Sequence, residues 1–216
     1  MLELFMRALP MLQQAIVITL ELAAGAFVLG TTFGLLIAFA RNARLAPVRW
    51  FSYFYVSVFR GTPLLVQLLL IYFGLPQFGI VMDPIWAALL ALTLFETAYI
   101  SEDFRSGING VDRGQWEAAM SMDMSYWTTI RRIILPQALR VATPSLGSRL
   151  ITLVKNTSLA STVTVVELTR VAEQIGSSTF RYMEMFLIVG AIYWIINQVL
   201  TIIQTWLEVR LSRSLR

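Results

Sequence analysis

The 216-residue sequence contains no cysteine and no histidine, and its only lysine is Lys155. Without cysteine the chain has neither a disulfide framework nor a thiolate metal site. Without histidine it lacks the commonest general base and the commonest metal ligand. Paired carboxylates could still act as catalysts, but the apolar stretches hold no close pair of acids. A membrane-embedded enzyme therefore has little support.

Charge is also scarce in this sequence. Charged residues make up 14% of the chain and hydrophobic residues 57%, whereas a soluble domain carries about 25% charged residues. A chain this apolar predicts a surface that largely faces lipid. The net charge is +4, but the arginines are spread among several loops instead of forming one stripe, which argues against nucleic-acid binding.

Long apolar stretches predict an all-α membrane protein, with five transmembrane helices in a single domain that spans residues 1–216. The stretches are long enough to cross a hydrocarbon core of about 30 Å, and the expected spans are residues 12–40, 50–73, 84–100, 143–166 and 185–207. The N-terminus lacks the basic region and cleavage site of a signal peptide, so we expect the first span to be retained.

Two of these spans contain residues that shape a helix. Segment 59–63 of the second span holds a charge, a glycine and a proline. It predicts a kink or break, because proline removes a backbone donor and disfavours helix in the residue before it. In the first span, Gly25, Gly30 and Gly34 predict close approach of a neighbouring helix.

The arginines lie mainly on one side of this topology. Loops 41–49 and 101–140 and the C-terminal tail carry most of them: Arg41, Arg44, Arg49, Arg105, Arg113, Arg131, Arg132, Arg140, Arg210, Arg213 and Arg216. The other side carries Arg7, Arg170 and Arg181. The positive-inside rule therefore predicts an external N-terminus and a cytoplasmic C-terminus. Loop 101–140 is then cytoplasmic, and its pattern is helical.

Loop 101–140 contains a regularly spaced motif. Residues 117–119 read Glu-Ala-Ala, Asp123 follows after three more residues, and Ile133, Leu135 and Pro136 follow after nine. This resembles the Glu-Ala-Ala loop of ABC importer permeases, except that Asp123 stands where the family has glycine. A turn there favours a left-handed or capping residue, and either Asp123 or Ser125 could cap the next helix.

Four further segments resemble the polar amino acid permease family, in the family's order along the chain. They are residues 59–67, 98–108, 114–119 and 153–160, and the resemblance covers most of residues 12–207. It implies the type I ABC importer architecture in a bacterial inner membrane. In that architecture two permeases, identical or sister chains, sit in the lipid above a cytoplasmic ABC ATPase dimer. A separate amino-acid-binding protein binds outside.

The same resemblance implies which residues couple the permease to the ATPase. They are Glu117, Ala118, Ala119, Asp123, Ile133, Leu135 and Pro136. Glu117 would anchor the loop to a basic partner, while Ala118 and Ala119 would give clearance. The chain itself would bind no cofactor, and ATP and Mg would belong to the ATPase. Consistent with this, the only lysine does not lie in a phosphate-binding loop.

Several polar residues fall inside the expected spans and are candidates for substrate contact. They are Arg60, Gln67, Glu96, Lys155, Asn156, Thr157 and Ser158, with Glu21 as a polar position on the first span. Ionisable groups are costly at membrane depth and usually face protein or water. Arg60 and Glu96 could together bind the carboxylate and the amine of an amino acid, so Glu96→Gln is expected to weaken transport without disturbing assembly.

Other roles stay open for these residues. Arg60 could brace the break or lie near an interface, Glu96 could form a salt bridge within the bundle, and Lys155 with Asn156 could join helices. The residues could also line an ion path in a secondary transporter or channel subunit. That alternative explains the charges in the membrane, but it does not explain a long structured loop with the Glu-Ala-Ala spacing.

Overall fold

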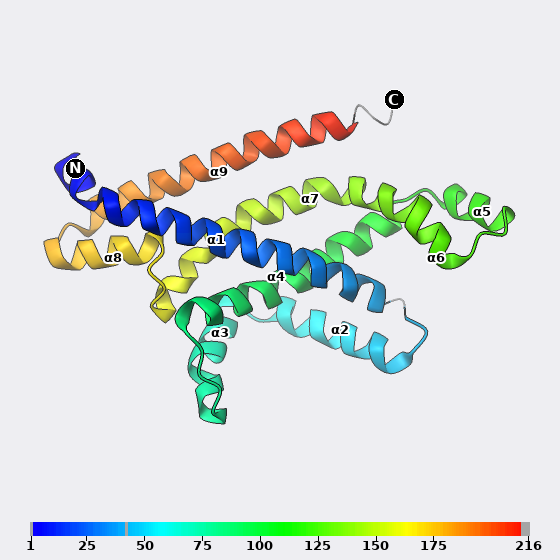
Figure 1. The fold of residues 1–216 in the computed structure, drawn as a ribbon, viewed down its shortest axis with the longest axis horizontal. Coiled ribbons are helices and arrows are strands. Elements are labelled where there is room, and N and C mark those ends of the chain that lie inside the picture. Colours follow the sequence, from blue (N-terminus) through cyan, green and yellow to red (C-terminus); the bar gives the residue numbers. More distant parts are fainter. Residues whose placement is uncertain (1, 42, 213–216) are drawn as a thin grey trace.

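The computed structural model describes residues 2–41 and 43–212, and within them every regular element is a helix. The all-α class expected from the sequence is confirmed for that part of the chain. The central helices are α1 (Leu2–Ala40), α4 (Pro84–Asn109) and α7 (Leu135–Asn156), and α4 packs against both of the others. Helix α9 (Tyr182–Ser212) packs against α7 and α8 (Figure 1).

Helices α1 and α4 approach closely at the three glycines of α1. A Cβ atom added at Gly25 would lie 3.1 Å from Leu89, and one at Gly30 would lie 3.0 Å from the Cβ of Glu96. The tightest point is Gly34, where an added Cβ would lie 2.9 Å from Ile100. The close approach predicted from the glycine spacing is therefore confirmed, and the neighbouring helix is α4.

The second apolar stretch is broken. Helix α2 (Ala46–Gly61) ends before Pro63, and α3 (Leu64–Leu69) continues through the short helices η1 (Leu70–Gly74) and η2 (Leu75–Phe78). The two halves are bent by 106°, so the predicted break is confirmed. In Figure 1 the segment from α3 onward projects away from the central helices.

Gln67 braces this break from the start of α3. Its side-chain Nε2 donates to the carbonyl oxygens of Phe59 at 2.9 Å and Thr62 at 3.1 Å, and to the Thr62 hydroxyl at 2.8 Å. These atoms belong to the end of α2 and the bend, where the helix no longer supplies backbone partners. Gln67 is buried, so in this conformation it stabilises the bend and does not present its amide to a substrate.

The loop expected at residues 101–140 is mostly helical and shorter than predicted. Helix α4 continues to Asn109, so residues 101–109 extend the third span instead of beginning the loop. The loop itself contains α5 (Arg113–Ser121), α6 (Tyr126–Thr129) and η3 (Ile130–Ile134). These short helices pack on their own apolar cluster of Val111, Ile130, Ile134 and Ala138. They lie at the end of the molecule opposite α8 (Figure 1).

The fourth span, predicted at residues 143–166, is wrong at both ends. Helix α7 begins at Leu135 and stops at Asn156, and η4 (Thr157–Val163) and α8 (Leu168–Thr179) follow as separate elements. Hydroxyl groups explain the stop, because Thr157 and Ser158 donate to the carbonyls of Val154 and Lys155. Such local bonds compete with helical backbone pairing.

Three helices among the described residues are long and apolar enough to cross a membrane: Glu3–Ala40, Pro84–Asn109 and Tyr182–Arg210. The bent pair α2 and α3–η2 gives a fourth if it counts as one span. Helix α7 is also long, but it is less apolar than these three helices. Arg213 and Arg216, which contributed to the predicted topology, lie outside the described residues.

Candidate functional site: an exposed loop and a polar surface

Helix α5 presents part of the Glu-Ala-Ala motif to solvent. Glu117 and Ala118 are exposed, as are the neighbouring side chains of Met120 and Met122. Ala119 is only 1% exposed. The expectation that Ala119 gives clearance to a partner is therefore corrected, because helical periodicity turns this alanine into the chain. The exposed surface consists of an acid, a small residue and two flexible apolar side chains.

The turn after α5 explains why aspartate can replace glycine. Asp123 has φ of 53°, in the left-handed region that asparagine and aspartate tolerate better than most residues. Ser125 caps α6, since its hydroxyl accepts from the backbone N–H of Thr128. Of the two capping candidates, Ser125 performs that role and Asp123 forms the turn.

The second half of the motif anchors the loop to α7. Pro136 stands in the first turn of α7, where its missing N–H costs no hydrogen bond. Ile133 and Leu135 pack against the apolar cluster beneath the loop. This packing fixes α5 relative to the end of α4 and the start of α7, so a force on α5 is transmitted to both long helices.

A carboxylate on α4 binds three arginines. Glu102 is 15% exposed and pairs with Arg41 directly after α1, with Arg60 of α2 at 3.3 Å and with Arg105 of α4 at 2.7 Å. Arg41 is almost fully buried, whereas Arg60 and Arg105 are about 40% exposed on their side chains. The cluster therefore joins the ends of three helices and retains excess positive charge.

Tyr99 lies between the guanidinium group of Arg60 and that of a further arginine, Arg149. The Cζ of Arg60 is 5.3 Å from the centre of its ring, and the Cζ of Arg149 on α7 is 4.6 Å away. Such distances allow cation–π attraction. Tyr99 thus connects α2 and α7 across α4.

Glu96 does not face Arg60. Its side chain is 1% exposed and its Cβ packs where α1 passes at Gly30. The carboxylate partner of Arg60 in this structure is Glu102, and the expectation that Arg60 and Glu96 together bind the two charges of an amino acid stays a prediction. One oxygen of Glu96, Oε2, has no hydrogen-bond partner. In this conformation Glu96 lies within the helix bundle and does not reach a surface that a substrate could approach.

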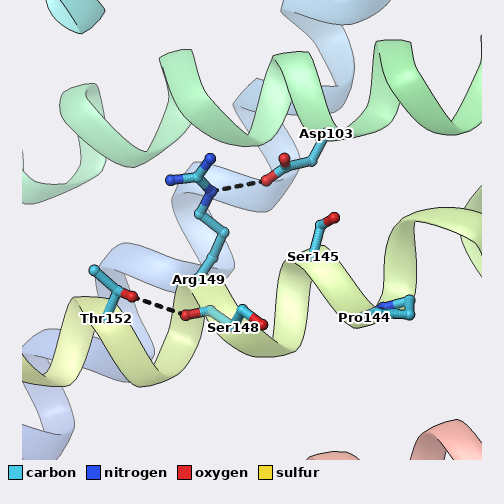
Figure 2. A pocket seen from close by; sticks show the side chains of 6 residues that line it. All are labelled: Asp103, Pro144, Ser145, Ser148, Arg149 and Thr152. Atoms are coloured by element: carbon cyan, nitrogen blue, oxygen red, sulfur yellow. Dashed lines mark hydrogen bonds and ion pairs between the residues drawn. The ribbon is translucent and has the colours of Figure 1, made fainter.

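A pocket of about 340 Å³ lies beside α4 and α7. Asp103 of α4 accepts from the Nε of Arg149 on α7 at 2.8 Å (Figure 2). Pro144, Ser145, Ser148 and Thr152 line the pocket along α7. The pocket thus combines one acid and one cation with several hydroxyl groups, all between helices of the central bundle.

Lys155 lines a second groove further along α7. Ser158, Thr169, Phe186, Gly190 and Tyr193 are among the residues that share this groove of about 350 Å³. Lys155 itself is exposed, Asn156 is half-buried, and Thr157 is fully buried with its hydroxyl bonded to the chain's own backbone. Of the four residues in this run, Lys155 and Ser158 are therefore the ones that reach the groove.

Asp103 and Arg149 were absent from the candidates drawn from the sequence. Asp103 was assigned to the cytoplasmic loop because the end of the third span was set too early. Arg149 falls inside the fourth predicted span, residues 143–166, but was not among the polar residues considered there. The sequence signal that could have identified this pair is an acid and an arginine in two adjacent apolar stretches, because charges at membrane depth are usually paired.

Among the described residues, no group of three or more acidic side chains is placed to hold a metal ion. The polar side chains of the two grooves are suited to hydrogen bonding and ion pairing with a small polar solute. The chemistry available at this surface is therefore binding and release.

Comparison with known proteins agrees with this description. Residues 30–213 match the family described as the binding-protein-dependent transport system inner membrane component. The chain is 42% identical to the probable amino-acid ABC transporter permease protein YckA of Bacillus subtilis (strain 168), over 95% of this chain and 91% of the relative. It is 37% identical to the arginine transport system permease protein ArtQ of the same organism, over 95% and 94%.

A solved structure shows the same fold. The crystal structure of an amino acid ABC transporter with histidines matches with a TM-score of 0.91 and 37% identity, covering 95% of this chain and 96% of that one. The chain therefore belongs to the family of inner membrane components of binding-protein-dependent transport systems.

Proposed function

We propose that this chain is the permease subunit of an ATP-driven importer for polar amino acids or their close derivatives. The observation that carries the proposal is the exposed acid Glu117 on α5, a helix that packs through Trp116 on the apolar cluster between the end of α4 and the start of α7. An ion channel or secondary transporter has no need of such a surface. The relatives named for amino-acid and arginine transport support the substrate class.

The partner at α5 is a cytoplasmic ABC ATPase dimer, which binds the ATP and Mg that this chain does not. The carboxylate of Glu117 offers two acceptor oxygens, so a basic side chain of the ATPase is its natural partner. Met120 and Met122 supply adaptable apolar contacts beside it. A second permease, identical or a sister chain, and an external amino-acid-binding protein complete the importer.

The proposed topology has five spans in a bacterial inner membrane, with the N-terminus outside and the C-terminus in the cytoplasm. Helix α7 is the fourth span along the chain, and its 22 residues extend for roughly 33 Å. Its charges tell against contact with lipid, so we place α7 in the interior of the assembled transporter. Arg41, Arg44 and Arg49 then lie on the same side as α5, as the positive-inside rule requires.

The translocation surface is the polar face of α7. Ser148, Thr152 and Lys155 are exposed on it at helical spacing, which is costly in lipid but suitable beside water or a polar solute. We propose that this face, with Arg60 near its end, lines the path. Gln67 and Glu96 act indirectly: Gln67 braces the bend between α2 and α3, and Glu96 lies at the contact of α4 with α1.

The Asp103–Arg149 pair supplies both charges that an amino acid requires. A zwitterion can replace the ion pair, with its carboxylate on Arg149 and its ammonium group on Asp103, because each protein charge then keeps an opposite charge. This exchange explains how two charges at membrane depth remain paired in the empty and the loaded state.

Co-purification tests the proposal. The tagged chain is extracted from its native membranes in mild detergent, and the recovered subunits are identified by mass spectrometry and assayed for ATP hydrolysis. We expect an ATPase to co-purify with the native chain and to be lost with Glu117→Arg. Glu3→Arg, in the first turn of α1, is the matched control, and this variant should retain the ATPase. An ATPase-free preparation from the native chain would contradict the proposal.

A further inference from the structure

A further pocket lies away from both grooves, where α1 ends. It has a volume of about 810 Å³ and is lined by Leu36, Phe39, Ala40, Ala43, Arg44, Tyr126 and Trp127. One wall is therefore the last turns of a membrane-spanning helix, and the other wall is α6 of the helical loop. None of these residues belongs to the proposed coupling or translocation surfaces.

The inner wall of the pocket is apolar and aromatic. The ring centres of Phe39 and Trp127 lie 6.2 Å apart and join the two walls. Trp127 is 67% exposed and Tyr126 is also exposed. Aromatic rings of this kind are enriched at the depth where a membrane meets water.

The pocket opens onto the lipid-facing side of α1. Leu29, Phe33 and Leu36 are exposed large apolar residues at positions i, i+4 and i+7, so they form one stripe along the helix. This stripe leads directly to the pocket, and an acyl chain that lies against it can enter sideways from the bilayer.

The other end of the pocket is positively charged. Arg44 is an exposed lining residue, and the Nη1 of Arg49 lies 3.4 Å from the carbonyl oxygen of Ala43, another lining residue. No carboxylate lines this pocket, and neither arginine forms an ion pair with an acid within the described part of the chain. Two guanidinium groups thus remain free to bind an anion at the edge of the membrane.

We propose that this pocket binds an anionic phospholipid, with its phosphate at Arg44 and Arg49 and an acyl chain against Leu36, Phe39 and Trp127. A cationic rim above an apolar wall matches the two parts of such a lipid. Because Trp127 belongs to α6, the bound lipid also supports the loop that carries α5. The proposal rests on α1 being in the membrane and not on the identity of the transported solute.

Native mass spectrometry tests the site directly. The intact complex, purified in detergent, is titrated with phosphatidylglycerol or with phosphatidylcholine of the same acyl chains, and the retained lipids are counted. We expect phosphatidylglycerol to be preferred and Arg44→Gln to weaken its binding about fivefold. Arg44→Lys should keep most of the affinity, since it keeps the charge. Arg140→Gln, which removes an exposed cation from α7, should have no effect.

Further results decide whether a lipid or another molecule occupies this pocket. Trp127→Ala should weaken the binding of both lipids, because it removes the wall that contacts the acyl chain. Equal retention of the two lipids, or unchanged phosphatidylglycerol binding by an Arg44→Gln/Arg49→Gln variant, would overturn the proposal. Cross-linking of position 44 to another protein subunit instead of to lipid would overturn it as well.

Discussion

Glu102 shows that a single residue can hold several elements of this chain together. It is the shared partner of Arg41, Arg60 and Arg105, and so joins α1, α2 and α4. The sequence placed Glu102 in a family motif but did not predict its partners, because they come from positions up to 61 residues away. Likewise the sequence marked Arg60 and Glu96 as charges at membrane depth without revealing that Arg60 pairs with Glu102 and that Glu96 is buried at the α1–α4 contact.

We predict that Glu102→Gln destabilises the fold on the order of 3 kcal/mol, because it leaves the buried guanidinium of Arg41 without a counter-charge. Unfolding by sodium dodecyl sulfate in mixed micelles, followed by circular dichroism, measures the change. The control is Glu3→Gln, which removes an exposed pair with Arg7 and should cost less than about 1 kcal/mol. Equal losses in the two variants would refute a special role for Glu102.

We also predict that Glu96→Gln lowers the rate of transport and leaves assembly intact. Its carboxylate is buried beside Gly30 at the α1–α4 contact, so the change acts through helix packing and not through substrate affinity. Uptake kinetics of the reconstituted importer should show a reduced maximal rate with a similar half-saturation concentration. Kinetics identical to those of the native chain would remove Glu96 from the mechanism.

Among the elements, those set by strong local signals were predicted best. Segment 59–63 predicted the break between α2 and α3, and the glycines of α1 predicted a close neighbour. The end of α7 was missed because an apolar pattern continues past Asn156, while the hydroxyl groups of Thr157 and Ser158 end the helix by bonding to its carbonyls. The extension of α4 to Asn109 was missed because charged residues there resemble a loop.

Gln67→Leu is predicted to loosen the bend between α2 and α3, since it removes three hydrogen bonds to the end of α2. The chain has no cysteine, so spin labels can be attached at Val58→Cys and Phe78→Cys without removing native thiols. Electron paramagnetic resonance should show a broader distance distribution in the variant. Gln14→Leu, which alters an exposed position on α1, should leave the distribution unchanged, and an unchanged Gln67→Leu distribution would contradict the bracing role.

Gly107→Ala is predicted to destabilise the contact of α4 with α7 by about 1–3 kcal/mol. A Cβ there would lie 2.6 Å from the carbonyl oxygen of Ala138, which belongs to backbone and cannot rotate away. The comparison is Gly190→Ala on α9, where an added Cβ meets nothing within 4 Å. That variant should be neutral or slightly more stable in the same unfolding assay; a neutral Gly107→Ala would show that the two helices can separate at little cost.

At the scale of the whole molecule, composition and motif spacing predicted a helical membrane permease, and the family match confirms it. The packing of α1, α4 and α7 could not be predicted, because it depends on contacts between residues far apart in the sequence. The exposed polar side chains of α7 are explained only by what lies beside this helix in the assembled transporter. A span that is too polar for lipid becomes reasonable once its exposed side faces a solute path or a second permease.

The measurement that tests the central claim most directly is uptake of radiolabelled polar amino acids into proteoliposomes that contain the chain with its co-purified subunits. The account predicts uptake that requires ATP, stops with Glu117→Arg and persists with Glu3→Arg. It would be contradicted if the purified chain, free of any ATPase, moved the same solutes across the membrane at the same rate.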